Sequence, residues 1–352
     1  MIEVIKDKDS WKAQIDSVVN SDFYHTYDYH QLSKNEGEEP VLIKYVDGQN
    51  SIVIPLLFRA IENSDYKDAT SVYGYAGPLV QHIDDSFDLE KFQSEFNNLL
   101  LEERIVSVFS RLHPFIDHQE RLLHGLGEVN TLGNVVYIDL RDSIEVQRAK
   151  FNRRVKTYLN KSRRSCTVIQ GNLDEHLDDF IRLYHQNMKR VDADDSYFFT
   201  DKYYRDVLSS DDYTSELSIC IHNETQEIIG ASMFMKKGNI VQYHLSGLSE
   251  DHFELNPIKL IIDEMRIKST QEGYEIFNLG GGLGSREDSL FRFKSSFSKA
   301  FEEFKTWKYI VNEEAYQSLT ESKFGADYDL HKDDIDFFPA YRSKVKIDKV
   351  NV

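Results

Sequence analysis

The sequence contains few of the residues and motifs on which metal and nucleotide enzymes depend. It has 2 cysteines, Cys166 and Cys220, which are far apart and belong to no C-x-x-C pair or cysteine–histidine cluster. We therefore expect two buried free thiols and no metal. The chain also lacks a Walker A loop, a G-x-G-x-x-G fingerprint, an H-E-x-x-H pair and a G-x-S-x-G elbow. These absences argue against nucleotide hydrolysis and zinc proteolysis.

Long apolar runs and an excess of positive charge are also missing. No apolar run reaches about 18 residues, and residues 1–11 have neither the apolar core nor the cleavage site of a signal peptide. We expect a cytoplasmic protein with at most peripheral membrane contact. The formal net charge is −18, which argues against a DNA-binding protein, although a local basic stripe could still hold a phosphate.

The length and the order of the expected elements predict two domains. The chain has 352 residues, of which 40% are hydrophobic, and this is enough for two cores. Similar strand and helix starts recur in the same order, at offsets of 177, 168, 168 and 170 residues: Ser51 and Ile228, Val72 and Ile240, Leu89 and Pro257, and Ile105 and Glu275. Either the two halves are homologous or ordinary α/β elements align by chance. We predict an N-terminal domain at 1–145 and a C-terminal domain at 146–352.

Hydrophobic periodicity and turn residues predict the individual elements. Expected strands lie at 3–5, 41–46, 51–58, 71–80, 105–110, 134–140, 216–221, 228–235, 239–245 and 275–279, and expected helices at 10–19, 87–103, 148–164, 257–271 and 313–319. Residues 327–336 are expected to form an acidic tail that carries no chemistry.

The densest chemical signal lies in the stretch 274–311. A short apolar strand is followed by a loop rich in glycine, which contains Gly280, Gly281, Gly282 and Gly284. Ser285 and Asp288 then have the spacing of a capping box, so a helix is expected to begin at Ser285. Because the first N–H groups of a helix have no intrahelical partner, this helix start favours an anion. We expect Gly280, Gly281, Gly282 and Asp288 to contact substrate.

A lysine lies within the apolar face of that predicted helix. At 100° per residue the face contains Leu290, Phe293, Phe297 and Phe301, and Lys294 falls inside the same sector. Burial of an ammonium is costly. Either Lys294 extends from the edge of the face to water or a carboxylate, or the lysine is retained for function.

The same stretch resembles a known family. The sequences L-G-G-G and G-S-R-E-D-S-L-F-R-F-K-S-S-F-S are similar to the C-terminal signature of the FemABX-like transferases, a tandem-GNAT family that includes the peptidoglycan bridge aminoacyltransferases. The resemblance implies an α/β fold of two tandem GNAT-like (acyl-CoA N-acyltransferase fold) units with mixed central sheets, and a transfer site in the C-terminal unit. It also implies that Phe293 lies at the transfer site and that Lys294 assists acyl transfer.

The segment 241–246 has one polar face. Strict alternation would place Gln242, His244 and Ser246 on one side and Tyr243 and Leu245 on the other. In a GNAT-like fold this strand and the strand at 275–279 would diverge, with the acyl group and the amine between them. Tyr243 and His244 would then orient the amine or relay its proton, and Ser246 would contact substrate. The alternative is that His244 and Tyr243 are ordinary core residues.

A basic stripe separates the two halves. Residues 148–164 contain eight Lys or Arg and no acid. The stripe is either a solvated helix face or a phosphate clamp. Because basic residues early in the second domain of some FemABX-like members contact the phosphates of nucleotide-linked acceptors, the resemblance points to Arg153 and Arg154 as substrate-binding residues.

The sequence leaves the donor open, with a mild preference for acyl-coenzyme A over aminoacyl-tRNA. Residues 247–257 are acidic and lack the glycine-rich pyrophosphate loop of GNAT enzymes that use acyl-coenzyme A. The net negative charge, and the lack of the long helical insertion of some tRNA-dependent relatives, argue against aminoacyl-tRNA. We expect a transferase without a tightly bound cofactor, acting on a nucleotide-linked or lipid-linked precursor in peptidoglycan or polysaccharide biosynthesis. A non-catalytic binding module remains the alternative from another class.

Overall fold

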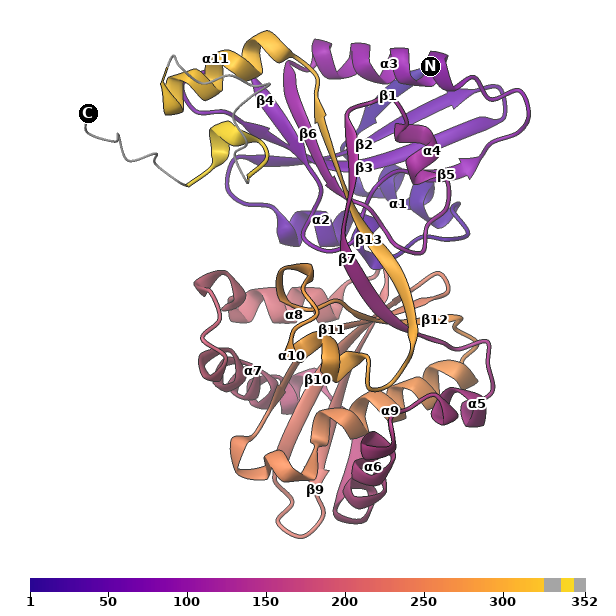
Figure 1. Ribbon diagram of the computed structural model, residues 1–352, viewed down its shortest axis with the longest axis vertical. Coiled ribbons are helices and arrows are strands. Elements are labelled where there is room, and N and C mark those ends of the chain that lie inside the picture. The colour runs from indigo at the N-terminus through magenta and orange to yellow at the C-terminus, as the bar shows by residue number, and fades with distance from the viewer. Residues whose placement is uncertain (326–336, 345–352) are drawn as a thin grey trace. The chain divides into compact units, whose positions relative to one another are not determined.

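The chain folds into two compact units. The computed structural model describes residues 1–325 and 337–344, so the expected acidic tail at 327–336 lies outside the described residues. Unit 1 consists of Met1–Val18, Ser33–Leu132 and the described residues from Phe304 onward, and unit 2 of Val19–Leu32 and Gly133–Glu303. The chain passes between the units within strands β7 and β13 (Figure 1).

Unit 1 is built on a mixed sheet with the strand order β1-β2-β3-β4-β6-β13, and β5 pairs with β3. All of these pairings are antiparallel except β4 with β6. The strands are β1 (Ile2–Ile5), β2 (Glu38–Asp47), β3 (Asn50–Ala60), β4 (Lys67–Thr70), β5 (Leu79–His82), β6 (Ile105–Arg111) and β13 (Ala300–Ile310). The helices are α1 (Lys8–Asp16), α3 (Leu89–Glu102), α4 (Gln119–Leu123) and α11 (Glu313–Phe324).

Unit 2 is built on a second mixed sheet with the order β7-β12-β11-β10-β9-β8, in which only β11 and β12 are parallel. The strands are β7 (Glu128–Asp139), β8 (Cys166–Gln170), β9 (Thr214–His222), β10 (Ile228–Lys237), β11 (Ile240–Leu248) and β12 (Ile276–Gly280). The helices are α2 (Tyr27–Ser33), α5 (Ile144–Ala149), α6 (Arg153–Ser165), α7 (Leu173–Arg190), α8 (Asp201–Ser209), α9 (Pro257–Gln271) and α10 (Ser289–Lys294), with 3-10 turns η1 (Phe23–His25), η3 (Glu250–Leu255) and η4 (Leu283–Ser285).

Two glycines show that α7 and α9 cover opposite faces of the unit 2 sheet. A Cβ atom on Gly230 would lie 2.7 Å from Pro257 of α9, and one on Gly247 would lie 2.3 Å from the backbone of Tyr184 in α7. Gly247 is paired with Ala231, the neighbour of Gly230. Because successive residues of a strand point to opposite faces, the two helices lie on opposite sides. Any larger residue at either glycine would push a helix away from the sheet.

The expected elements are largely observed, with two corrections. The expected strand at 71–80 is wrong: β4 ends at Thr70, and Gly74 and Gly77 have φ of +126° and +97°, which an extended strand cannot contain. The single helix expected at 148–164 is divided into α5 and α6, because Asn152 has an extended backbone and donates its N–H to the backbone oxygen of Ser296. Helices α7 and α8 lie outside the expected elements. No helix in the described part of the chain has the length and apolar character needed to span a bilayer.

The predicted boundary between residues 145 and 146 falls inside α5, within unit 2. Each unit also contains a segment from a distant part of the chain. Unit 2 includes Val19–Leu32, and unit 1 includes the described residues from Phe304 onward, where β13 pairs with β6. The compact units are therefore not two consecutive halves of the sequence.

Candidate functional site

The candidate site lies where β11 and β12 stop pairing. The two strands are hydrogen-bonded in parallel only from Ile240 to Gln242 on β11 and from Ile276 to Asn278 on β12. Both strands continue beyond that point, β11 to Leu248 and β12 to Gly280. Their divergence matches the arrangement expected from the sequence. The predicted site residues that follow it on the two strands and in the glycine loop are Tyr243, His244, Ser246, Gly280, Gly281 and Gly282.

Lys294, the last residue of α10, is buried beside the end of β12. Its side chain donates from Nζ to the backbone oxygen of Gly281 at 2.7 Å, and the residue is only 9% exposed. No carboxylate among residues 1–325 and 337–344 forms an ion pair with it. Burial lowers the pKa of Lys294 to about 8, against the opposing charge of Asp288. An ammonium has three donors, so the group retains capacity to bind a carbonyl oxygen or an oxyanion.

The helix that carries Lys294 is shorter than the sequence predicts. It begins after Asp288, whereas Ser285 belongs to η4 and has φ of +61°. Because α10 ends at Lys294, the proposed four-residue apolar face does not exist. Leu290 and Phe301 are exposed, and Phe301 lies on β13. The residue of α10 that enters the core is instead Phe291.

Asp288 fills the helix start that was expected to bind an anion. One carboxylate oxygen accepts from the backbone N–H of Phe291 at 2.9 Å, and the other from that of Leu283 at 3.2 Å. Burial opposes this charge, but hydrogen bonds from backbone N–H groups outweigh it and lower the pKa of Asp288. An incoming anion would meet a carboxylate, so the anion site predicted at this helix start is wrong. What Asp288 does in the structure is join the glycine loop to α10, and its contact with substrate stays a prediction.

The glycine loop requires glycine at two positions. Gly280 has φ of +79°, which disfavours a side chain. A Cβ on Gly282 would lie 2.0 Å from the backbone oxygen of Arg286 and 2.4 Å from Oδ1 of Asp288. At Gly281 the nearest atom, the backbone oxygen of Asn134, would be 3.1 Å away. The loop therefore packs backbone against backbone and presents the Gly281 carbonyl to Lys294.

A β-bulge at His244 changes which side chains share a face. Tyr243 pairs with Phe234 and Leu245 with Met233, so His244 has no partner of its own on β10. An extra residue inverts the alternation beyond it. The expectation that Ser246 lies on the same face as His244 is therefore wrong. Ser246 instead shares the face of Tyr243, whose hydroxyl hydrogen-bonds its Oγ.

His244 and Tyr243 enter different environments. Phe23 contacts the His244 ring edge-on with centroids 5.4 Å apart, and the Tyr203 hydroxyl lies 3.2 Å from Nε2. Burial lowers the pKa of His244 to about 4, so the imidazole is neutral at pH 7. Tyr243 packs on the core cluster beside Phe234, and burial raises its pKa to about 12. Of the two, only His244 is a proton acceptor near neutrality.

The basic stripe divides into a structural part and a free part. Arg148 of α5 and Arg163 of α6 both bind the buried carboxylate of Asp263, at 3.2 and 2.6 Å, and so join these two helices to α9. Arg153 and Arg154 are exposed in the first turn of α6, and neither forms an ion pair within the described residues. The start of α6 is held beside the segment that follows Lys294, because the N–H of residue 152 binds the oxygen of residue 296 at 2.9 Å.

Two residues near the site were not predicted. Tyr203 comes from α8, and no sequence motif marks it. Asn278 lies in the short strand I-F-N-L-G and is fully buried. An amide among apolar neighbours is a signal that the sequence itself carries.

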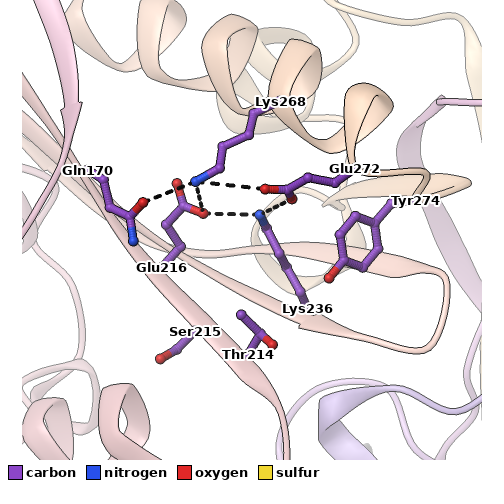
Figure 2. Close-up of a pocket in the computed structure, with 8 residues that line it drawn as sticks. All are labelled: Gln170, Thr214, Ser215, Glu216, Lys236, Lys268, Glu272 and Tyr274. Carbon is purple, nitrogen blue, oxygen red and sulfur yellow. Dashed lines mark hydrogen bonds and ion pairs between the residues drawn. The ribbon is translucent and has the colours of Figure 1, made fainter.

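A separate pocket of about 340 Å³ contains none of the predicted residues. Figure 2 shows that its two ammonium groups and two carboxylates neutralise one another. Lys236 binds Glu216 at 3.0 Å and Glu272 at 2.7 Å, and Lys268 binds Glu216 at 2.7 Å. Lys236 lies at the end of β10, opposite the start of β11, whereas the Gly281 loop follows the end of β12. The balanced charges make this pocket a weaker candidate than the Lys294 site.

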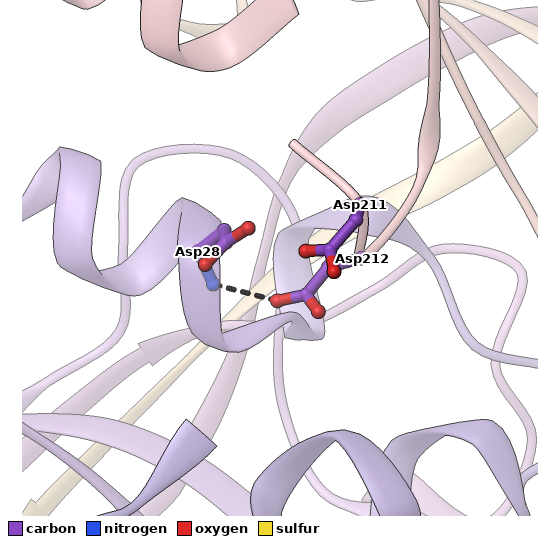
Figure 3. A group of neighbouring side chains, drawn as sticks. All are labelled: Asp28, Asp211 and Asp212. Carbon is purple, nitrogen blue, oxygen red and sulfur yellow. Dashed lines mark hydrogen bonds between the residues drawn. The ribbon is translucent and has the colours of Figure 1, made fainter. Parts of the chain in front are cut away.

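Three aspartates of unit 2, Asp28, Asp211 and Asp212, bring carboxylate oxygens within 4.8 Å of one another (Figure 3). The backbone N–H of Asp28 donates to Asp212 at 2.9 Å, and the Ser210 hydroxyl donates to Asp28 at 2.7 Å. These bonds join α2 to the segment before β9, so the cluster is explained as a structural junction.

A family model matches the part of the chain that contains the candidate site. Residues 208–321 match the model of the FemAB family, a segment that contains His244, the glycine loop and Lys294 but not Arg153 or Arg154. No curated protein sequence matches the chain.

Solved structures resemble nearly the whole chain. The crystal structure of FemX has 14% identity and a TM-score of 0.71, covering 90% of this chain and 99% of that one. A conserved protein of unknown function from Bacteroides thetaiotaomicron VPI-5482 has 12% identity and a TM-score of 0.57, with coverage of 88% and 100%. The C-terminal domain of a candidate lysylphosphatidylglycerol synthetase from Agrobacterium fabrum has 14% identity and a TM-score of 0.55, with coverage of 90% and 96%.

At these identities the structural likeness establishes the fold. The predicted α/β fold of two tandem GNAT-like units with mixed sheets is confirmed. The match over 208–321 and the fold shared with FemX confirm the predicted resemblance to the FemABX-like family.

Proposed function

We propose that the protein is an acyltransferase that moves an acyl or aminoacyl group onto an amine of a cell-envelope precursor, either an amino sugar or a peptidoglycan peptide. The observation that carries the proposal is the buried ammonium of Lys294, held by the Gly281 carbonyl where β11 and β12 diverge. The family match and the FemX-like fold support it.

The reaction needs a neutral amine close to an activated carbonyl. A C–N bond forms, the C–S bond of a thioester or the C–O bond of an ester breaks, and the amine proton passes through the site to the leaving thiol or hydroxyl. Lys294 would donate to the carbonyl oxygen as it becomes an oxyanion. His244 would orient the amine or accept its proton. Phe293 and Tyr243 would pack against the reacting groups.

A specific observation bears on each donor. Glu250, Asp251 and Glu254 are exposed in and around η3, directly before α9, and their charges would repel the pyrophosphate of acyl-coenzyme A. The exposed cations of α6 offer positive charge to a polyanion such as tRNA. We therefore rank aminoacyl-tRNA before acyl-coenzyme A as the donor, which reverses the mild preference that the sequence alone supports.

Mass spectrometry of candidate acceptors tests the proposal. The purified protein is incubated with UDP-linked amino sugars and peptidoglycan precursors, with charged tRNA in one arm and acetyl-coenzyme A in the other. A gain of one amino-acid residue or one acetyl group on an acceptor identifies the donor class.

Lys294→Met should abolish the mass gain while acceptor binding survives. Lys299→Met is the matched control, because Lys299 is exposed and also donates Nζ to a backbone carbonyl, that of Ser295, at 2.8 Å. If acceptors bind but gain no mass in either arm, the binding-module alternative replaces the enzyme.

A further inference from the structure

A relay of buried hydrogen bonds runs from the carboxylate of Asp22 through Gln242 and Asn278 to the glycine loop. Gln242 Nε2 donates to Asp22 Oδ2 at 2.6 Å, and Asn278 Nδ2 donates to Gln242 Oε1 at 2.9 Å. The backbone N–H of Gly280 then donates to Asn278 Oδ1 at 2.9 Å. Asp22 and Asn278 are fully buried, and Gln242 is 2% exposed.

The two ends of this relay fix the orientation of the Gln242 and Asn278 amides. A carboxylate oxygen only accepts, so Gln242 must turn its NH₂ group toward Asp22 and its oxygen toward Asn278. Asn278 must then present its NH₂ group to Gln242 and its oxygen to the N–H of Gly280. Only this orientation of the two amides pairs every donor of the relay with an acceptor. A flipped amide at either position would place two donors or two acceptors in contact in a buried site, which is costly.

The relay ends at Gly280, one residue before the carbonyl that binds Lys294. Gln242 and Asn278 are also the last pair of the parallel ladder before β11 and β12 diverge. The bond from Gly280 N–H to Asn278 holds Gly280 in its left-handed conformation, φ +79°. That conformation directs the next carbonyl, of Gly281, toward Lys294 Nζ at 2.7 Å.

We propose that Gln242 and Asn278 are positioning residues for Lys294: they lock the glycine loop so that the Gly281 carbonyl holds the ammonium at the point where the strands part. This inference rests on the proposed function for its effect on turnover, but the positioning itself is independent of it. Loss of the relay lets the Gly281 carbonyl turn away and water reach the ammonium.

The direct readout is the titration of Lys294 in protein labelled with ¹³Cε-lysine, with its signal assigned by its loss in Lys294→Met. In Asn278→Leu the pKa of Lys294 should rise from about 8 toward the ordinary value of 10.5. With an active enzyme, kcat should fall by about 10- to 100-fold with little change in KM, as expected for a misplaced reacting group. Gln147→Leu, which removes another buried amide of unit 2, should destabilise the protein but leave both quantities unchanged.

A charge-swap cycle keeps the inference testable if Asn278→Leu fails to fold. Gln242→Glu places a carboxylate against Asp22, and the relay should break. Adding Asp22→Asn lets residue 22 donate to the carboxylate at position 242, which still accepts from Asn278. The double variant should therefore restore both the pKa of Lys294 and the kcat of transfer.

An unchanged Lys294 titration in a folded Asn278→Leu or Gln242→Glu protein overturns the inference, as does failure of the double variant to rescue Gln242→Glu. If wild type shows no turnover but the Lys294 titration responds as expected, the proposed function fails while the positioning role stands.

Discussion

Lys259 of α9 lies over the ring of Phe293, with Nζ 5.3 Å from the ring centroid. The same ammonium is 5.4 Å from the ring of Tyr158 on α6, and its hydrogen bond goes to Asn256 at 2.7 Å. Burial lowers the pKa of Lys259. A cation between two rings therefore connects the helix that carries Arg154 to the residue that precedes Lys294.

We expect Lys259→Met to release the Phe293 ring and slow transfer. A partly desolvated cation–π contact is worth about 0.5 to 2 kcal/mol, so kcat should fall roughly 2- to 30-fold. Lys259→Arg retains a cation over the rings and should keep most of the activity. Steady-state kinetics of both variants decide the matter, and equal losses in the two would show that the ring contact is unimportant.

The pH dependence of transfer separates two roles for Lys294. If Lys294 acts as a cation, its contribution to kcat should be lost as the pH rises through about 8, the pKa that burial gives it. A lysine that acts as a base would produce the opposite trend. In Lys294→Arg the residual activity should lack the decline, because a guanidinium stays charged. The rate of Lys294→Arg also corrects for ionisation of the substrate amine.

Lys294 should reduce stability. Its folded pKa of about 8 lies below the unfolded value of 10.5, so the unfolded chain binds more protons between these values and stability rises with pH across that window. Below pH 8 the cost of burial is fully present, about 3 kcal/mol, and loss of the Gly281 hydrogen bond offsets about 1 kcal/mol. Lys294→Met should therefore stabilise the protein by about 1 to 2 kcal/mol at pH 7.

Urea unfolding of Lys294→Met at pH 7 and at pH 10 measures this effect. The gain should shrink at the higher pH, and Lys299→Met should show almost none at either. A destabilised Lys294→Met at pH 7 would mean that the ammonium is a net structural contact and is not retained at a cost to stability.

The sequence predicts most strands and most helices of this fold because their periodicity is local, whereas the short strands β4 and β8 lie outside the expected elements. The glycine loop and Lys294 were also identified locally, since an unpaired lysine among aromatic residues is a strong departure from a core pattern. The helix start was placed three residues early because Ser285 and Asp288 both fit a cap, and only the N–H of Phe291 chooses between them. The bulge at His244 depends on how β11 pairs with β10, and no pattern within β11 encodes that register.

Substitution of Arg153 and Arg154 tests whether the start of α6 binds a phosphate of the substrate. Each Arg→Gln change should raise KM for a phosphate-bearing substrate by roughly 10- to 100-fold, because a charge-assisted hydrogen bond to phosphate is worth about 1.5 to 3 kcal/mol. Lys161 and Arg164 are the matched controls, since both are exposed in the last turns of the same helix. If the stripe is only a solvated face, all four changes should leave KM unaltered. If tRNA lies along the whole helix, all four should weaken binding to a similar degree and reduce its salt dependence, whereas a local phosphate clamp requires that only the first two do so.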